Sequence, residues 1–376
     1  MKVRLLLIIS IIVLGLSGAY IGKLLNQDFV LSKELNYNAT ISVWTTTPEL
    51  SSLLMRFQDK ENIKVNIKQF QNSALLFEEL ELTKLNNDAP DLVEVSSLNE
   101  MALLKNDYAI FPVDGLADKS SFHPAAIENF SSEKALYAYP LGIEVPTIYV
   151  NRALVQQEVF PAIYPFQPEK VLTQYEQLQN DRSEKHPATS FWMLHFDDQL
   201  DWYWSSHQLA GNSSSQQDFD SQWAELVEEY QLVPQLDSHM AITRFANSEI
   251  GALISNSKHI QSMQQLIGNR FEFDINPFLM EEEDKIQVSG NGLAVLTDAA
   301  ESSESIKLLF QFLGTAEEQT ELLSGTGWLP AQQSLLESDA FIHQLPMFKH
   351  LQGLTKYQNN FIGVEIDGQK KVSNET

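Results

Sequence analysis

The order of short strand-like and helix-like segments between residues 41 and 107 restricts the fold of this chain more than any other feature of the sequence. Predicted strands cover residues 41–44, 63–67 and 92–95. Predicted helices cover residues 48–57 and 73–85, and a third begins after residue 97. Apolar residues alternate or form short runs in the strands, and they recur at helical spacing in the helices. Strand, helix, strand, helix, strand predicts a mostly parallel sheet covered by helices, which is an α/β fold.

Two of the predicted helix starts carry capping signals. Thr47 precedes Pro48, and proline is favoured at the first position of a helix. Ser97 is followed by Glu100 at the spacing of a capping box. We therefore expect both hydroxyl groups to cap helices, a role that competes with ligand binding by the same side chains.

The first 25 residues have the pattern of a targeting segment. Two basic residues precede an apolar stretch at 5–16, and small residues follow at 17–19, as in a secretory signal peptide cleaved after residue 19. Apolar character continues to residue 22, so residues 5–22 could instead remain as a membrane tether. Both interpretations predict export, to the periplasm or the outer face of the cytoplasmic membrane, with residues 26–37 as a linker.

Charge and missing motifs argue against several classes of function. The 50 acidic and 25 basic residues give a formal charge of −25, which disfavours nucleic-acid binding. The sequence has no cysteine, no phosphate-binding glycine loop, no G-x-S-x-G motif and no H-E-x-x-H motif. His195, Asp197 and Asp198 come nearest to a metal cluster, and a histidine with two exposed acids at the end of a strand is the favoured interpretation. We predict no catalytic residue, no metal site and no cofactor.

A run of aromatic residues indicates that the chain binds a small polar solute. Trp202, Tyr203 and Trp204 are adjacent, and neighbours on a strand face opposite sides, so at least one ring faces solvent or a cleft. Pyranose rings pack their C–H faces on flat aromatic rings, and their hydroxyl groups need amide, hydroxyl or carboxylate partners. The alternative is that these rings belong to the core, where tryptophan is usually buried.

Several short motifs follow one another along the chain. They are ISVW at 41–44, PDLV at 90–93, YPLG at 139–142, YVN at 149–151, FAN at 245–247, ALIS at 252–255, GLAV at 292–295 and GWLPA at 327–331. Their order and spacing resemble the family 1 extracellular solute-binding proteins of ABC importers, which include the maltose-binding protein. The resemblance covers roughly residues 40 to 335, and the last motif is the most distinctive.

The resemblance implies a type II periplasmic-binding-protein fold, in which two α/β lobes are joined by hinge strands and hold the ligand in a cleft between them. The first lobe would comprise residues 38–142 and 276–322. The second would comprise residues 146–273 and 326–376. A third crossing between the lobes would lie near residues 323–327.

The resemblance, together with the predicted strand ends, also implies a set of ligand-binding residues. Glu144 matches a glutamate that binds sugar hydroxyl groups in relatives, and Asp201 and Tyr203 match a cleft acid and a cleft aromatic residue. Loops at the carboxyl ends of parallel strands add hydroxyl groups to the site. The full predicted set is Trp44, Thr45, Thr46, Ser96, Ser97, Glu144, Asp201, Trp202, Tyr203, Trp204, Ser255, Lys258 and Trp328.

One position departs from the family pattern. Relatives commonly place a tryptophan that stacks on the ligand where this chain has Lys258. Lysine donates charge-assisted hydrogen bonds, which opens the possibility of an acidic sugar or another anionic solute. The alternative for Lys258 is an ordinary surface lysine. Trp328 either stacks on the ligand or holds the hinge.

We therefore predict a non-enzymatic receptor that captures a small polar ligand, a mono- or oligosaccharide, and presents it to the membrane subunits of an ABC importer. Two other functions stay open at this point. One is a ligand-sensing subunit for a membrane receptor kinase, and the other is a secreted carboxylate-dependent glycoside hydrolase. A polyamine or a metal chelate is a further alternative ligand.

Overall fold

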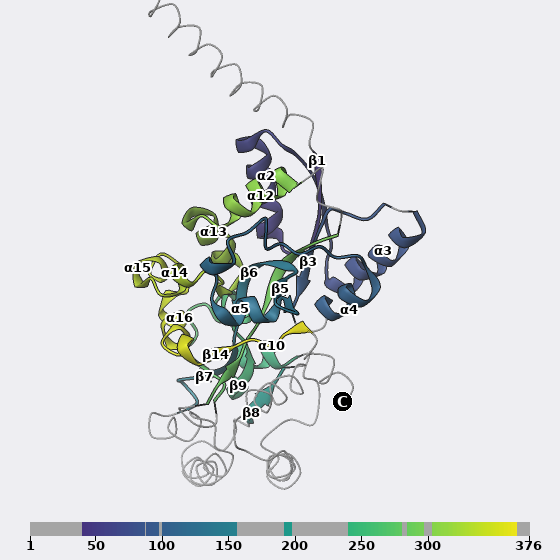
Figure 1. The fold of residues 1–376 in the computed structure, drawn as a ribbon. Helices are drawn as coiled ribbons and strands as arrows, with labels where there is room; N and C mark the ends of the chain where they lie inside the picture. The colour runs from purple at the N-terminus through teal and green to yellow at the C-terminus, as the bar shows by residue number, and fades with distance from the viewer. Residues whose placement is uncertain are drawn as a thin grey trace, which may run out of the picture.

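Two β-sheets form the framework of the molecule in the computed structural model, which describes residues 40–86, 88–97, 100–155, 192–197, 240–279, 284–296 and 303–366. Figure 1 shows the first sheet, which contains β1 and β3, above the second, which contains β7, β8 and β9. The six strands of the first sheet are β1 (Thr40–Thr45), β2 (Lys64–Gln69), β3 (Leu92–Ser96), β6 (Ala138–Glu144), β12 (Ser289–Val295) and β13 (Leu329–Pro330). Their spatial order is β13-β6-β12-β3-β1-β2.

The parallel half of the first sheet comes from the alternating segments at the start of the fold. β1 pairs in parallel with both β2 and β3. Helix α2 (Pro48–Glu61) connects β1 to β2, and α3 (Ser73–Asn86) connects β2 to β3. The apolar residues of α2 recur at helical spacing and are buried, among them Leu50, Leu54 and Phe57. The α/β fold predicted from the strand and helix order is confirmed.

The second sheet has four strands in the order β10-β7-β9-β8. They are β7 (Pro146–Asn151), β8 (Trp192–Phe196), β9 (Ile250–Asn256) and β10 (Phe273–Pro277). β7 is antiparallel to both β9 and β10, whereas β8 is parallel to β9. Every residue of β7 and β9 is buried, because packed elements cover both faces of these strands.

Very few residues join the two sheets. β6 ends at Glu144 and β7 begins at Pro146, so Val145 alone separates the two sheets. In the other direction, the chain leaves the second sheet after β10 and re-enters the first at β12. Leu329 and Pro330 pair with Ile143 and Gly142, so β13, which follows the third predicted crossing, is still part of the first sheet.

That pairing differs from the predicted assignment of residues 326 onward to the second lobe. Farther along the chain, α16 (Phe348–Thr355) packs against β10 of the second sheet. The remaining lobe boundaries stay a prediction.

The other elements surround the two sheets. The helices are α4 (Glu100–Asp107), α5 (Pro124–Asn129), α10 (Ala241–Ala246), α11 (Ile260–Ile267), α12 (Ser303–Leu313), α13 (Ala316–Thr326), α14 (Gln333–Leu336) and α15 (Asp339–Ile342). Short 3-10 helices are η2 (Lys119–Ser121), η5 (Ser257–His259) and η6 (Gln358–Asn360). The small strands are β4 (Ser131–Ser132), β5 (Ala135–Leu136), β11 (Ile286–Gln287) and β14 (Phe361–Ile362).

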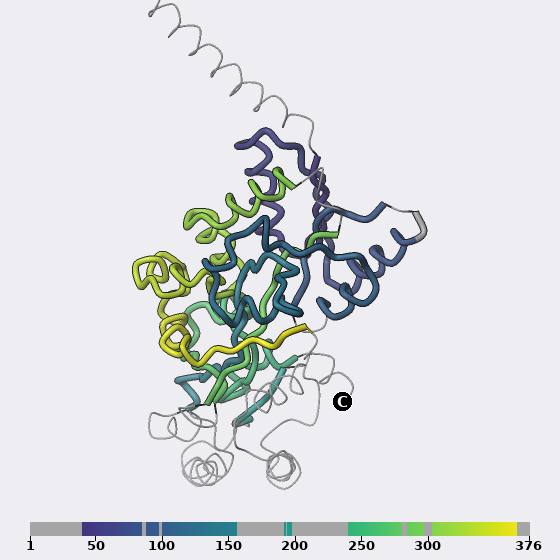
Figure 2. Tube along the Cα trace, in the orientation of Figure 1, coloured from purple at the N-terminus to yellow at the C-terminus, as the bar shows by residue number. Residues whose placement is uncertain are grey.

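Packing brings distant parts of the chain together around the first sheet. Helices α12 and α13, from the last quarter of the chain, contact α2 near its start, as Figure 2 shows. β14 pairs with β11. Across the described ranges, none of the helices has the length and apolar character needed to cross a membrane.

Candidate functional site

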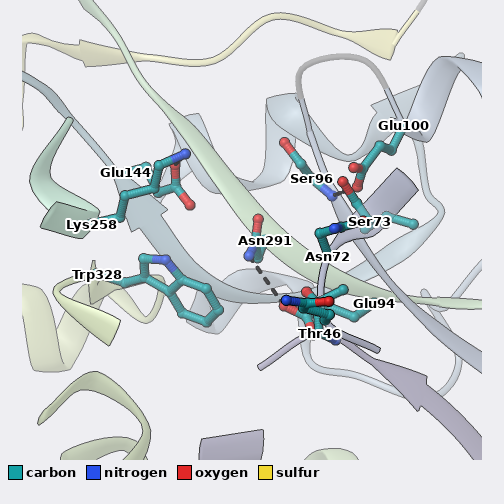
Figure 3. Close-up of a pocket in the computed structure, with 12 residues that line it drawn as sticks. Thr46, Asn72, Ser73, Glu94, Ser96, Glu100, Glu144, Lys258, Asn291 and Trp328 are labelled. Atoms are coloured by element: carbon teal, nitrogen blue, oxygen red, sulfur yellow. Dashed lines mark hydrogen bonds and ion pairs between the residues drawn. The ribbon is translucent and has the colours of Figure 1, made fainter. Parts of the chain in front are cut away.

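A cavity of about 420 Å³ lies where the two sheets meet, within the size range of small-molecule sites. Its wall is polar and comes almost entirely from the first sheet and its loops, with Lys258 contributed from the second (Figure 3). The lining residues are Thr46, Gln71, Asn72, Ser73, Glu94, Val95, Ser96, Glu100, Glu144, Lys258, Asn291 and Trp328.

The position of the cavity follows from the topology of the sheet. Thr46 follows β1, residues 71–73 follow β2, and Ser96 ends β3. These three strands are parallel, so their carboxyl ends lie at one edge of the sheet. That edge is where open α/β sheets bind their ligands, because the loops there are free to carry polar side chains.

Glu94 organises the floor of the cavity, and sequence reasoning missed it. The residue is only 3% exposed, and its carboxylate accepts five hydrogen bonds. The backbone N–H groups of Thr46 and Thr47 donate to Oε2 at 2.9 and 3.1 Å. The hydroxyl of Thr45 donates to Oε2 and that of Thr47 to Oε1, the latter at 2.6 Å. Asn291 Nδ2 donates to Oε1 at 3.2 Å.

Five donors occupy all the acceptor positions that a carboxylate offers. Glu94 therefore holds the loop after β1 against the side chain of Asn291 from β12, and has little capacity left for a ligand. A signal for this residue was present in the sequence. It is the one charged side chain in the otherwise apolar run from Leu92 to Val95.

The predicted capping role of the Thr47 side chain is wrong. Thr47 does stand at the N-cap of α2 and Pro48 follows it, but its hydroxyl makes no capping hydrogen bond. The hydroxyl donates instead to the buried carboxylate of Glu94. A charged acceptor makes a stronger hydrogen bond than a neutral one, so the carboxylate wins the competition for this hydroxyl.

Glu100 fixes a second part of the wall. Its Oε2 accepts the backbone N–H of Ser96 at 2.6 Å. Burial raises the pKa of Glu100, and the neighbouring charges of Glu94 and Glu144 raise it further. Hydrogen bonds from Ser96 and from the Ser73 side chain oppose that rise in pKa. The glutamate thus joins the first residue of α3 to the end of β3.

Ser97 does not form the predicted capping box with Glu100. Its hydroxyl accepts the N–H of Gly290 at 3.0 Å, and its own N–H donates to the Gly290 carbonyl at 2.8 Å. Glu100 reaches back to Ser96, one residue earlier than expected. Ser97 is buried and ties β3 to β12, because the ladder between these strands needs partners for both groups of Gly290.

Glu144 and Lys258 form an ion pair between the two sheets. Glu144 ends β6, and its side chain is 8% exposed. Lys258 lies in η5, directly after β9, with 32% of its side chain exposed. Lys258 Nζ lies 3.9 Å from Glu144 Oε2. The next residue back, Ser257, exchanges two hydrogen bonds with Val145, which fixes η5 against the connection between the sheets.

Trp328 forms one side of the cavity, although it is only 4% exposed. Its side chain packs directly over Gly142, where an added Cβ would lie 2.7 Å from Trp328 Cβ. Gly327 precedes it with φ +70°, which favours glycine, and ends α13. A Cβ on Gly327 would lie 2.8 Å from the carbonyl oxygen of Ser257. Two glycines therefore allow the close approach that places this ring.

Of the predicted site residues, five lie together in the cavity wall: Thr46, Ser96, Glu144, Lys258 and Trp328. Asp201, Trp202, Tyr203 and Trp204 lie outside the described residues. The contribution of each of these residues to ligand binding stays a prediction.

Four other predicted residues are placed outside the cavity. Trp44 packs against Phe70 with a ring-centroid distance of 5.2 Å and lines a separate, smaller hollow. Thr45 is fully buried beneath Glu94, and Ser97 is used by the strand ladder.

Ser255 is also fully buried, and its hydroxyl donates to Asp197 Oδ2 at 2.6 Å. Ser255 lies only three residues before the cavity residue Lys258, but its side chain forms a hydrogen bond within the second sheet. Among the residues that the structure describes, no group of three metal-ligating side chains forms a metal-binding cluster.

The chain is similar to known proteins in family and in fold. A family model described as bacterial extracellular solute-binding protein matches residues 52–349. Among curated proteins, none matches this sequence.

Solved structures share the two-lobed mixed α/β fold. UgpB from Mycobacterium tuberculosis, in complex with glycerophosphocholine, has a TM-score of 0.71 at 15% identity, covering 90% of this chain and 92% of that chain. The cyclic alpha-maltosyl-1,6-maltose binding protein of Arthrobacter globiformis has a TM-score of 0.69 at 12% identity, covering 90% and 94%. The maltose-maltodextrin binding protein of Alicyclobacillus acidocaldarius has a TM-score of 0.62 at 15% identity, covering 90% and 96%. At these identities the likeness concerns the fold, and the predicted two-lobed fold is confirmed.

Proposed function

The chain belongs to the bacterial extracellular solute-binding proteins, and on that premise we propose that it captures a mono- or oligosaccharide in the cavity between its two sheets and delivers it to an ABC importer. The family is one of binding proteins, so it favours neither a hydrolase nor a sensor subunit. Several structural neighbours are named as binding proteins for maltose-type saccharides, which supports the sugar assignment.

The observation that carries this proposal is the chemistry of the cavity wall. Trp328 supplies an aromatic surface, and the other walls supply amide, hydroxyl and carboxylate groups. A polyol needs this mixture, because its C–H faces pack on aromatic rings while each buried hydroxyl needs a hydrogen-bond partner. Asn291 lies at the centre of the wall, and the hydrogen bond from its Nδ2 to Glu94 holds its side chain in a fixed orientation.

Capture would proceed by closure of the two lobes. Lys258 brings the second sheet into the cavity wall, so a ligand that contacts both sides binds best when the lobes are together. Such a ligand shifts the population toward the closed form. The closed, loaded form would then be recognised by the importer's membrane subunits. We place the protein in the periplasm or on the outer face of the cytoplasmic membrane, with residues 1–25 as a cleaved signal or residues 5–22 as a tether.

A thermal-shift screen tests the proposal. The mature chain is heated with a panel of neutral mono-, di- and oligosaccharides, and hits are confirmed by calorimetric titration. A saccharide at a hundred times its Kd adds about 2.7 kcal/mol to the free energy of unfolding, which raises Tm by several degrees. Glu144→Ala should remove most of that shift, whereas Glu304→Ala, on the exposed face of α12, should leave it unchanged.

Two results would contradict this function. If none of the saccharides shifts Tm or gives heat of binding, the assignment to sugars is wrong. If the purified protein hydrolyses the saccharide it binds, the receptor function gives way to that of a glycoside hydrolase.

A further inference from the structure

Negatively charged side chains outnumber positively charged ones in the wall of the cavity. Three carboxylates, Glu94, Glu100 and Glu144, face one ammonium group, that of Lys258. The chain as a whole carries a formal charge of −25, which adds to the negative potential around any opening to solvent. Any preference that these charges impose on the solute rests on the proposed function.

Lys258 is not positioned to attract an anion. Its ammonium group lies 3.9 Å from the carboxylate of Glu144, so the positive charge is already opposed by a negative one. An anionic ligand near Lys258 would also lie near the carboxylate of Glu144, which would repel it. That repulsion is weakly screened, because the Glu144 side chain is only 8% exposed. The anionic solute that Lys258 suggested in the sequence is therefore disfavoured by its neighbour.

The three carboxylates differ in what they can offer a ligand. Glu94 accepts five hydrogen bonds from the protein, and Glu100 accepts the N–H of Ser96. Among the described residues, none donates a hydrogen bond to the carboxylate of Glu144, whose ion pair with Lys258 is 3.9 Å long. Figure 3 shows Glu144 and Glu100 on different sides of the cavity, with Asn291 between them. Glu144 is thus the carboxylate with acceptor capacity left for a solute. Lys258 offsets part of its charge, but the wall also holds Glu94 and Glu100, so carboxylates outnumber ammonium groups around the solute.

We propose that the solute is an amino-substituted saccharide whose protonated amine donates to Glu144, with the sugar ring beside Trp328 and Asn291. The amine forms a charge-assisted hydrogen bond, which is shorter and stronger than one made by a hydroxyl in the same place. The ring hydroxyl groups retain the amide and hydroxyl partners described above. A neutral sugar of the same shape makes the same contacts except for this charge.

Paired ligands test the inference directly. Glucosamine is titrated against glucose, and the fully deacetylated disaccharide of the chitosan series against cellobiose, by calorimetry at about pH 6.5, where amines of this kind are protonated. We expect the amino member of at least one pair to bind roughly five- to tenfold more tightly. Added salt should reduce that advantage, because it screens the charge.

Charge variants locate the effect. Glu144→Gln keeps a hydrogen-bond acceptor but removes the charge, so the advantage of the amino member should fall to about twofold or less while the neutral member loses less affinity. Lys258→Met removes the competing ammonium group and should increase the advantage. Glu304→Gln removes one negative charge outside the cavity wall and should leave both members of each pair unchanged.

The outcomes separate this inference from the proposed function. If neutral saccharides bind and their amino analogues bind equally or more weakly, the amine preference is wrong and the saccharide receptor stands. Tighter binding of glucuronate than of glucosamine would overturn it in the same way. If no member of any pair binds and no neutral saccharide from the wider panel does, the proposed function itself fails. Binding of putrescine without any saccharide would also overturn both, in favour of a polyamine receptor.

Discussion

Replacing Glu94 tests whether one buried carboxylate holds the wall of the cavity together. Three of its five hydrogen bonds come from buried donors, namely the Thr45 hydroxyl and both the N–H and the hydroxyl of Thr47. The donors of Thr46 and Asn291 are partly exposed, so water can replace the carboxylate there. In Glu94→Ala the Thr47 N–H and the Thr45 hydroxyl keep weaker neutral acceptors, Thr45 Oγ1 at 3.0 Å and the Thr47 carbonyl at 3.4 Å, so the Thr47 hydroxyl is the buried donor left without one. That unsatisfied donor costs about 1–1.5 kcal/mol, and each of the two lost bonds to the carboxylate adds about 1 kcal/mol, which gives about 3 kcal/mol for Glu94→Ala.

Glu94→Gln provides a second, shape-conserving change. The amide keeps one acceptor oxygen but turns an NH₂ group toward donors that need an acceptor. We therefore expect a loss of about 2 kcal/mol, intermediate between wild type and Glu94→Ala. Urea unfolding followed by circular dichroism measures both variants, and the midpoint should fall while the slope with denaturant stays the same. Glu304→Ala, an exposed helical position, is the control and should change stability by less than about 0.5 kcal/mol.

A double-mutant cycle with Thr47→Val gives the sharper test. The hydroxyl of Thr47 donates to Glu94 at 2.6 Å, so the two substitutions should be coupled by about 1–2 kcal/mol. The reasoning is refuted if Glu94→Ala costs less than about 1 kcal/mol, or if the cycle shows no coupling. Either result would mean that solvent satisfies the donors and that the carboxylate does not organise the loop after β1.

Two further predictions concern the frame of the site and its response to acid. Gly142→Ala should destabilise the protein by about 1–3 kcal/mol and lower Tm, because the new Cβ meets Trp328 at 2.7 Å; an unchanged Tm would show that the ring moves freely. Burial lowers the pKa of His123 from its ordinary value of 6.5, and its Nδ1 accepts the N–H of Ala125 at 3.2 Å as the cap of α5. The unfolded chain then binds the proton more readily, so stability should be lost as pH falls below about 6.5. His123→Asn keeps a capping acceptor without titrating and should flatten the dependence of the urea midpoint on pH; an equal slope in the variant would contradict this origin.

The fold could be predicted because each of its first strands and helices is encoded by a short stretch of sequence. The first strands and helices are each encoded within about 15 residues, by the spacing of apolar positions and by Pro48 at a helix start. Strand and helix order then leaves few topologies, because crossovers between parallel strands are restricted in connection and handedness. The pairing of Leu329 and Pro330 with β6 could not be predicted, because nothing local in the sequence indicates it.

The site was predicted only in part, because its residues act on one another over long separations in the sequence. Glu94 and Asn291 are 197 residues apart, and their contact depends on the register of β3 against β12. Trp44 and Thr45 were both assigned to the ligand, although side chains on a strand alternate between faces. The structure turns Trp44 toward Phe70 and places Thr45 beneath Glu94.

By itself, the sequence determined an α/β framework, a two-lobed family and the approximate edge of the sheet where the candidate cavity lies, since apolar periodicity and motif order are properties of neighbouring residues. The tertiary structure alone decided which hydroxyl groups face the cavity and which form hydrogen bonds with Glu94 or within the strand ladder. It also placed the carboxylate of Glu144 3.9 Å from the ammonium group of Lys258, a pairing that the sequence does not indicate. The physical reason is that hydrogen bonding and charge depend on the nearest partner in space, and that partner is supplied by strands far apart along the chain.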